Sequence, residues 1–216
     1  MNKTMLITIQ VCAIIIISGS LGGMLFYTDI YDEVESGIVK VLCLSCIKLQ
    51  PKTSKEFTFK TANNKSHPDF VINHLKNNGP ILIQYGEKAC LACDNMIDNV
   101  IKPYFNLSFD KTKSFETQVS LENLSFMYIY IYIDDDSTTD EKIDSFNNYD
   151  KDHITGFPMF TIITIEYDHG GDIKPYYTSL YGEFEENQDY EKMYETFIEL
   201  LEFSNELYDR NIAGFN

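Results

Sequence analysis

Four of the five cysteines in this chain fall into two pairs with the same spacing, Cys43 with Cys46 and Cys90 with Cys93. Two thiols three residues apart can close a small disulfide ring, exchange that disulfide with another one, or contribute to a zinc site. Chance placement of this many cysteines gives on the order of a tenth of one such pair. We therefore expect the paired cysteines to have a chemical or structural role.

The residues around the second pair predict where its sulfurs lie. PILIQYG, residues 80–86, is an apolar run typical of a buried strand, and residues 90–105 carry apolar side chains at helical spacing. Both sulfurs would then lie on one side of the first helical turn. Unpaired N–H groups and partial positive charge at a helix start favour a thiolate. The sequence thus predicts Cys90 as the attacking thiol and Cys93 as the resolving thiol.

Strand and helix patterns alternate along the rest of this region. Strands are predicted for EFTFKT (56–61) and LSFMYIYIYI (124–133), and a hairpin for residues 158–182 around HGG, with Pro175 favouring an edge position for its second strand. Helices are predicted for residues 67–78, 138–149 and 189–208. This order indicates an α/β fold with a mixed sheet, in which parallel crossovers come first and an antiparallel hairpin last.

Three motifs together resemble the thioredoxin superfamily over about residues 56–205. They are PILIQYGEKACLAC, then ITGFPMFTIITI, then YYTSLYGEF before an acidic amphipathic helix. The resemblance implies a thioredoxin-like fold, a mixed central sheet flanked by helices, with thiol–disulfide exchange at Cys90 and Cys93 and no cofactor. It also implies that Pro158 is cis and lies against the sulfurs, and that the backbone of Phe157 pairs with a substrate strand.

The sequence departs from the family pattern at several places, among them Ala89, where a Trp is frequent before the first cysteine. Leu91 and Ala92 separate the cysteines where Gly-Pro is frequent, and Gln84 occupies the position of a buried acid that assists proton transfer in many thioredoxins. Glutamine cannot take up a proton near neutral pH. We therefore expect slower activation of Cys93 unless Glu87 or a water molecule substitutes.

The sequence leaves three roles open for Cys43 and Cys46. They form a second redox couple that exchanges with Cys90 and Cys93 or with a membrane partner, or they form an inert disulfide or two packed thiols beside apolar neighbours. The third role is a zinc site built from all four thiols. Compact Cys₄ modules separate their pairs by about 15–20 residues, fewer than lie between Cys46 and Cys90, so we expect no metal.

An uncharged apolar segment at residues 4–28 predicts a membrane anchor within residues 1–28. Lys3 precedes this segment and acidic residues follow it, so the positive-inside rule predicts a single-pass protein with a cytoplasmic amino terminus and the remainder outside the cytoplasm. A cleaved signal peptide is the alternative. We expect a connector at 29–55, a thioredoxin-like domain at 56–208 and a C-terminal tail at 209–216.

The charge of the chain limits its partners. A formal net charge of -16, from 33 acidic and 17 basic residues, disfavours nucleic acid and other polyanions. The predicted function is a membrane-anchored extracytoplasmic thiol–disulfide oxidoreductase that acts on protein thiols and disulfides in cell redox homeostasis. The alternative is a non-catalytic thioredoxin-fold module for binding or assembly, in which both cysteine pairs are structural.

Overall fold

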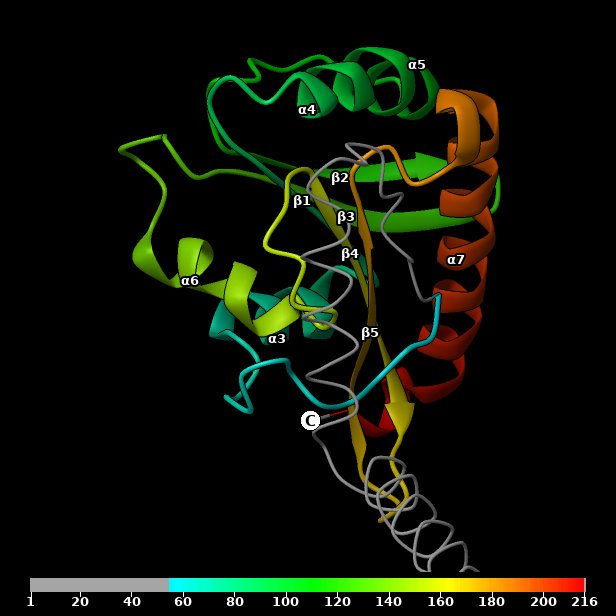
Figure 1. Cartoon of the computed structure of the whole chain (residues 1–216). Helices are drawn as coiled ribbons and strands as arrows, with labels where there is room; N and C mark the ends of the chain where they lie inside the picture. The colour runs from blue at the N-terminus through cyan, green and yellow to red at the C-terminus, as the bar shows by residue number, and fades with distance from the viewer. Residues whose placement is uncertain (1–54, 216) are drawn as a thin grey trace, which may run out of the picture. The chain divides into compact units, whose positions relative to one another are not determined.

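The computed structural model describes residues 55–215, which form a mixed α/β unit (Figure 1). The predicted anchor, the connector up to residue 54, and the pair Cys43 and Cys46 lie outside the described residues. Among the helices within 55–215, none combines the length and the apolar character that crossing a bilayer requires.

A five-stranded mixed sheet of order β2-β3-β1-β4-β5 forms the centre of this unit. The strands are β1 (Ile81–Gly86), β2 (Phe115–Leu121), β3 (Leu124–Tyr132), β4 (Met159–Tyr167) and β5 (Ile173–Tyr181). β1 pairs in parallel with β3 and antiparallel with β4, while β2 and β5 extend the sheet with antiparallel pairs. Of the predicted parallel crossovers, the one from β1 to β3 is present, and so is the late antiparallel hairpin of β4 and β5.

Helices cover both faces of the sheet (Figure 1). The helices are α3 (Asp69–Asn77), α4 (Leu91–Met96), α5 (Lys102–Phe105), α6 (Asp140–Tyr149) and α7 (Tyr190–Asn211). Successive side chains of β1 point to opposite faces, so Leu82 packs in the cluster with α4, α5 and α7. Ile81 and Ile83 pack in the other cluster, with residues of α3 and α6. Because both faces are covered, β1 is buried along its whole length.

The helical segment that follows β1 contains a wider turn. A π-helical turn, Ile97–Ile101, separates α4 from α5, where the sequence predicted one uninterrupted helix. Pro103 lies in the first turn of α5, a position at which a residue without an N–H group is tolerated. Asn106 ends α5 in the left-handed conformation, at φ 52.

The prediction of a strand at residues 56–61 is wrong. Thr58 makes a single antiparallel bridge with Tyr177 of β5, through Thr58 N–H to Tyr177 C=O at 2.7 Å and Tyr177 N–H to Thr58 C=O at 3.0 Å. In an antiparallel ladder the next such pair would join Lys60 to Pro175, and proline has no N–H to donate. The ladder therefore stops, and Phe59 packs on the ring of Tyr176 instead.

Two further differences are a strand that was not predicted and the end of the last helix. β2 was not predicted, although Phe115–Leu121 alternates between more and less exposed residues and is joined to β3 by the two residues Glu122 and Asn123. The last helix extends to Asn211, and a 3₁₀ turn, Ile212–Gly214, follows it. The tail predicted from residue 209 thus begins inside α7, because Ile212 and the following turn pack against the core.

Candidate functional site

Cys90 and Cys93 are joined by a disulfide bond with an S–S distance of 2.04 Å and a Cα–Cα distance of 5.2 Å. Cys90 is the N-cap residue of α4, with extended backbone angles of φ -85 and ψ 97. The N–H of Cys93 donates to the Sγ atom of Cys90 at 3.1 Å. The predicted pair therefore meets at a helix start, where a backbone donor is directed at the first sulfur.

The two cysteines differ in solvent access. Cys93 is 3% exposed, whereas Cys90 is only half-buried. Leu91, between them, is 73% exposed, which is unusual for a large apolar side chain. Cys90 is thus the more exposed of the two cysteines, and a partner that approached it would meet Leu91 beside it.

The turn that leads from β1 to Cys90 is fixed by close packing and by one side chain. At Gly86, a Cβ atom would lie 2.8 Å from the Oη atom of Tyr130, so the end of β1 requires glycine. Ala89 has a positive φ of 61, an uncommon conformation for alanine. The N–H of Lys88 donates to Asp134 Oδ2 at 2.7 Å. These contacts set the direction in which the chain enters α4.

Phe157 and Pro158 lie immediately before β4. The peptide bond between them is cis, and Pro158 is buried with its carbonyl accepting the N–H of Gly182 at 2.7 Å. The ring of Phe157 stacks on Phe146 of α6 with centroids 4.8 Å apart. Tyr85 pairs with Met159. The antiparallel register therefore brings Pro158 to the same end of the sheet as the turn before the dithiol.

Asp150 organises the loop that leads to Pro158, and sequence reasoning missed it. Its side chain is 4% exposed and accepts the N–H groups of Ile154 at 2.9 Å and Thr155 at 3.0 Å. Thr155 has a positive φ of 53, an outlier for a β-branched residue. Asp150 caps the C-terminus of α6, where the helix dipole disfavours a carboxylate. An acidic residue at the end of a predicted helix was therefore the sequence feature that could have indicated a role for Asp150.

Gln84 is fully buried in β1, as the strand prediction required. Its Oε1 atom accepts a hydrogen bond from the hydroxyl of Tyr128 at 2.7 Å. Its Nε2 atom has no hydrogen-bond partner among the described residues. Gln84 therefore supplies a buried donor where the resemblance places a buried acid, while Glu87 is exposed on the turn after β1.

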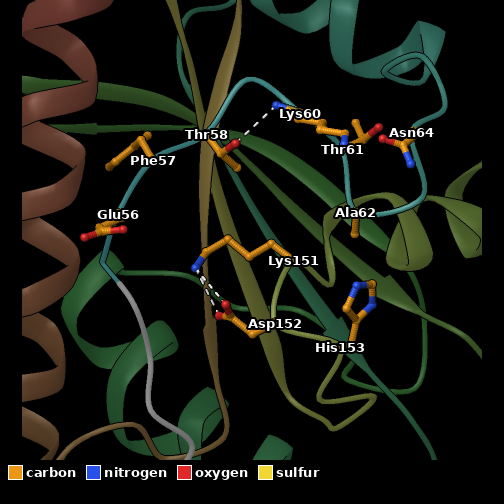
Figure 2. A pocket seen from close by; sticks show the side chains of 10 residues that line it. All are labelled: Glu56, Phe57, Thr58, Lys60, Thr61, Ala62, Asn64, Lys151, Asp152 and His153. Carbon is orange, nitrogen blue, oxygen red and sulfur yellow. Dashed lines mark hydrogen bonds and ion pairs between the residues drawn. The ribbon is translucent and has the colours of Figure 1, made fainter. Parts of the chain in front are cut away.

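A polar pocket of about 480 Å³ lies elsewhere on the unit (Figure 2). Residues 56–64 and the loop residues 151–153 line it, and neither cysteine does. Figure 2 shows Lys151 directed at Asp152, with an ion pair of 3.0 Å. His153 is exposed at its rim. Because neither cysteine lies there and Lys151 and Asp152 already pair with each other, the dithiol remains the chemically distinctive site.

Comparison of the chain with protein-family models, with curated proteins and with solved structures finds no match. Within residues 55–215, no three His, Cys, Asp or Glu side chains converge as a metal ion would require.

Proposed function

We propose that this protein is a membrane-anchored thiol–disulfide oxidoreductase with a thioredoxin-like fold, working outside the cytoplasm. The observation that carries the proposal is the asymmetric disulfide at the start of α4, with Cys90 accessible and Cys93 buried. Redox-active dithiols need one sulfur that a partner can reach and a second that only the first can reach.

The reaction is thiol–disulfide exchange in two steps. In the reduced protein, the Cys90 thiolate attacks one sulfur of a substrate disulfide, forms a mixed disulfide and releases the other substrate sulfur as a thiolate. Deprotonated Cys93 then attacks the Cys90 sulfur, so the Cys90–Cys93 disulfide forms and the second substrate thiolate leaves. Two electrons pass from the dithiol to the substrate, and the same steps in reverse oxidise a substrate dithiol.

Several groups in the site support this chemistry. The Cys93 N–H that points at Cys90 Sγ would stabilise a thiolate there, and the dipole at the start of α4 acts in the same direction. Pro158, at the same end of the sheet, would shape the groove in which the backbone of Phe157 pairs with a substrate strand. Gln84 cannot accept a proton from Cys93, so we expect the second step to be slow near neutral pH.

The membrane location rests on the sequence. Residues 4–28 carry no charge, which suits a span across the bilayer. An oxidising compartment outside the cytoplasm is also where disulfides persist. Cys43 and Cys46, between this segment and the described unit, would be placed to exchange with a membrane redox partner.

The test is a trapping experiment on the full-length chain in detergent. Cys93→Ser should accumulate a mixed disulfide between Cys90 and a reducible protein substrate such as insulin, because the step that releases the substrate is blocked. Cys90→Ser is the matched control and should trap nothing. If Cys93→Ser forms no adduct and the wild-type protein does not reduce insulin, the proposal fails, and a non-catalytic binding or assembly module becomes the better interpretation.

A further inference from the structure

A lysine from a distant loop pairs with two carboxylates on the helical segment that carries the dithiol. Lys111 lies in the loop between α5 and β2, and its Nζ atom is 2.8 Å from Asp94 Oδ1 and 3.0 Å from Asp98 Oδ2. Asp94 directly follows Cys93, and Asp98 lies one turn further along. Asp98 has a second cation, because the Nζ atom of Lys102 lies 3.5 Å from Asp98 Oδ1. Lys111 therefore shares the compensation of Asp98 and pairs with Asp94 beside the two cysteines.

The main chain of Lys111 is held as well. The hydroxyl of Tyr130 donates to the carbonyl of Lys111 at 3.0 Å. Burial raises the pKa of Tyr130, so this phenol stays protonated and remains a donor at neutral pH. Tyr130 also packs against Gly86, at the end of β1. The same tyrosine thus connects the loop of Lys111 with the turn that leads to Cys90.

The charges on this helical segment bear directly on the reactivity of Cys90. The N–H of Asp94 donates to the carbonyl of Cys90 at 3.1 Å, so Asp94 lies one helical turn after Cys90, a relation in which Cβ atoms are typically about 6 Å apart. A carboxylate at that distance disfavours a thiolate on Cys90, and a paired ammonium offsets the effect. The hydrogen bond with Lys111 lowers the pKa of Asp98, and the one with Asp94 raises the pKa of Lys111. Asp98 and Lys111 are therefore ionised at neutral pH.

Other charged groups near Cys90 come from each neighbouring segment. The preceding turn carries Glu87 and Lys88, and Asp134, beyond β3, holds the N–H of Lys88. The segment after β5 carries Glu183, which accepts a hydrogen bond from Asn95 of α4 at 3.1 Å. Acidic groups predominate in this set, so loss of the positive charge of Lys111 should lower the fraction of Cys90 that is thiolate.

We propose that Lys111 is a positioning residue for thiol–disulfide exchange: by neutralising Asp94 and Asp98 it keeps the Cys90 thiolate populated at neutral pH. The inference rests on the proposed function, since it assigns a role in the activation of the attacking thiol. Lys111 itself touches neither sulfur in this role, and acts only through the carboxylates of α4 and the π-helical turn.

The experiment measures alkylation of Cys90 by iodoacetamide in the reduced full-length chain, across pH and with the site resolved by peptide mass spectrometry. Lys111→Gln should slow alkylation at pH 7 about threefold, the effect of one uncompensated charge about 6 Å away in a water-like medium. The pH midpoint of the reaction should move upward. Lys111→Arg should restore the wild-type profile, since it keeps the charge.

A matched control lies in the same loop. Lys113 pairs with Asp135 at 3.1 Å, away from the helical segment, so Lys113→Gln should leave the alkylation profile unchanged. Asp94→Asn combined with Lys111→Gln should recover most of the lost rate. In 1 M NaCl the difference between Lys111→Gln and wild type should shrink, because salt screens partly exposed charges. A merely structural lysine would give neither the rescue nor the salt effect.

The two proposals fail separately, because alkylation needs no disulfide substrate. A slower Lys111→Gln profile without any trapped adduct refutes the oxidoreductase proposal alone. Trapped adducts, together with a Lys111→Gln profile identical to that of Lys113→Gln, refute the role of Lys111 alone.

Discussion

Two loops reach the same end of the sheet, and they are held in different ways. Residues 87–89, before the dithiol, are exposed, and the exposed carboxylate of Asp134 accepts one of their N–H groups. Residues 151–157, before Pro158, are tied to the buried carboxylate of Asp150 through two N–H groups. Both loops contain non-glycine residues at positive φ, Ala89 in the first, and His153 and Thr155 in the second.

The two loops differ in how firmly their backbone is held. The first loop is exposed and leads to the half-buried Cys90, and only one carboxylate supports it. In the proposed function the second loop positions the wall of a substrate groove, and such a wall must keep its conformation when a partner binds. Uncommon backbone conformations persist only where surrounding contacts determine them, and Asp150 supplies those contacts in the second loop. The following four predictions test this difference, beginning with the largest expected effect.

Asp150→Ala should destabilise the fold by about 3 kcal/mol, because it leaves two N–H groups without their charged acceptor. The measurement is urea unfolding of the oxidised protein. Asp134→Ala is the matched change in the first loop and should cost less than about 1 kcal/mol, since water replaces an exposed acceptor. Equal losses at the two positions would contradict the comparison.

Leu91→Ser should lower the rate of exchange with a protein disulfide about tenfold, the equivalent of losing roughly 1.4 kcal/mol of apolar contact with the partner. Exchange with oxidised glutathione, which is too small to cover Leu91, should be unchanged. Phe203→Ser, at a residue of α7 that is 42% exposed, is the control and should affect neither rate. A parallel loss with glutathione would instead indicate damage to the dithiol itself.

His67, which contacts the residue before Asp150, should make the free energy of unfolding depend on pH. Burial lowers its pKa from 6.5, and its Nδ1 atom lies 3.1 Å from the hydroxyl of Tyr149, the residue before Asp150. The unfolded chain therefore binds more protons than the folded one below pH 6.5. His67 favours folding fully above that pH, and this contribution is lost as pH falls through the lowered value.

The measurement is the free energy of unfolding between pH 5 and 7.5. His67→Gln should flatten the decline below pH 6.5, whereas His169→Gln, at an exposed position of the β4–β5 turn, should leave it in place. An unchanged decline in His67→Gln would assign it to other groups.

Ala89→Gly should stabilise the protein by about 0.5–1 kcal/mol. Glycine adopts a φ of 61 without strain, and the strain that is removed exceeds the cost of the entropy that glycine adds to the unfolded chain. Thermal unfolding of the oxidised protein gives the measurement. Ala92→Gly, two residues into α4, is the matched control and should destabilise by about 1 kcal/mol. Loss of stability in both variants would mean that the turn gains nothing from glycine.

Much of the site could be read from the sequence because it depends on local order. The apolar strand before Cys90, the helical spacing after it, and the spacing of the two cysteines predict the disulfide at a helix start that the structure contains. The Gly-Phe-Pro motif likewise marked the start of a strand. The roles of Asp150 and Lys111 were not predicted, since each depends on contacts with backbone or side chains that local patterns do not place.

The failed predictions have the same origin. An alternating aromatic segment at residues 56–61 has the local pattern of a strand, yet pairing also needs a neighbour with free N–H groups, and Pro175 denies it one. β2 carries only a weak alternating pattern, but β3 accepts it as an antiparallel partner across seven residue pairs. Strand formation is a property of two segments, and one segment alone does not decide it.

By itself, the sequence determined where the cysteine pair lies and which element presents it, because thiol spacing and helical periodicity are local properties. Tertiary structure decided the rest. It buried Cys93 and left Cys90 accessible, brought Pro158 to the end of β1, and placed Lys111 against Asp94. The physical reason is that exposure and electrostatic environment are set by whatever segments pack nearby, wherever they lie along the chain.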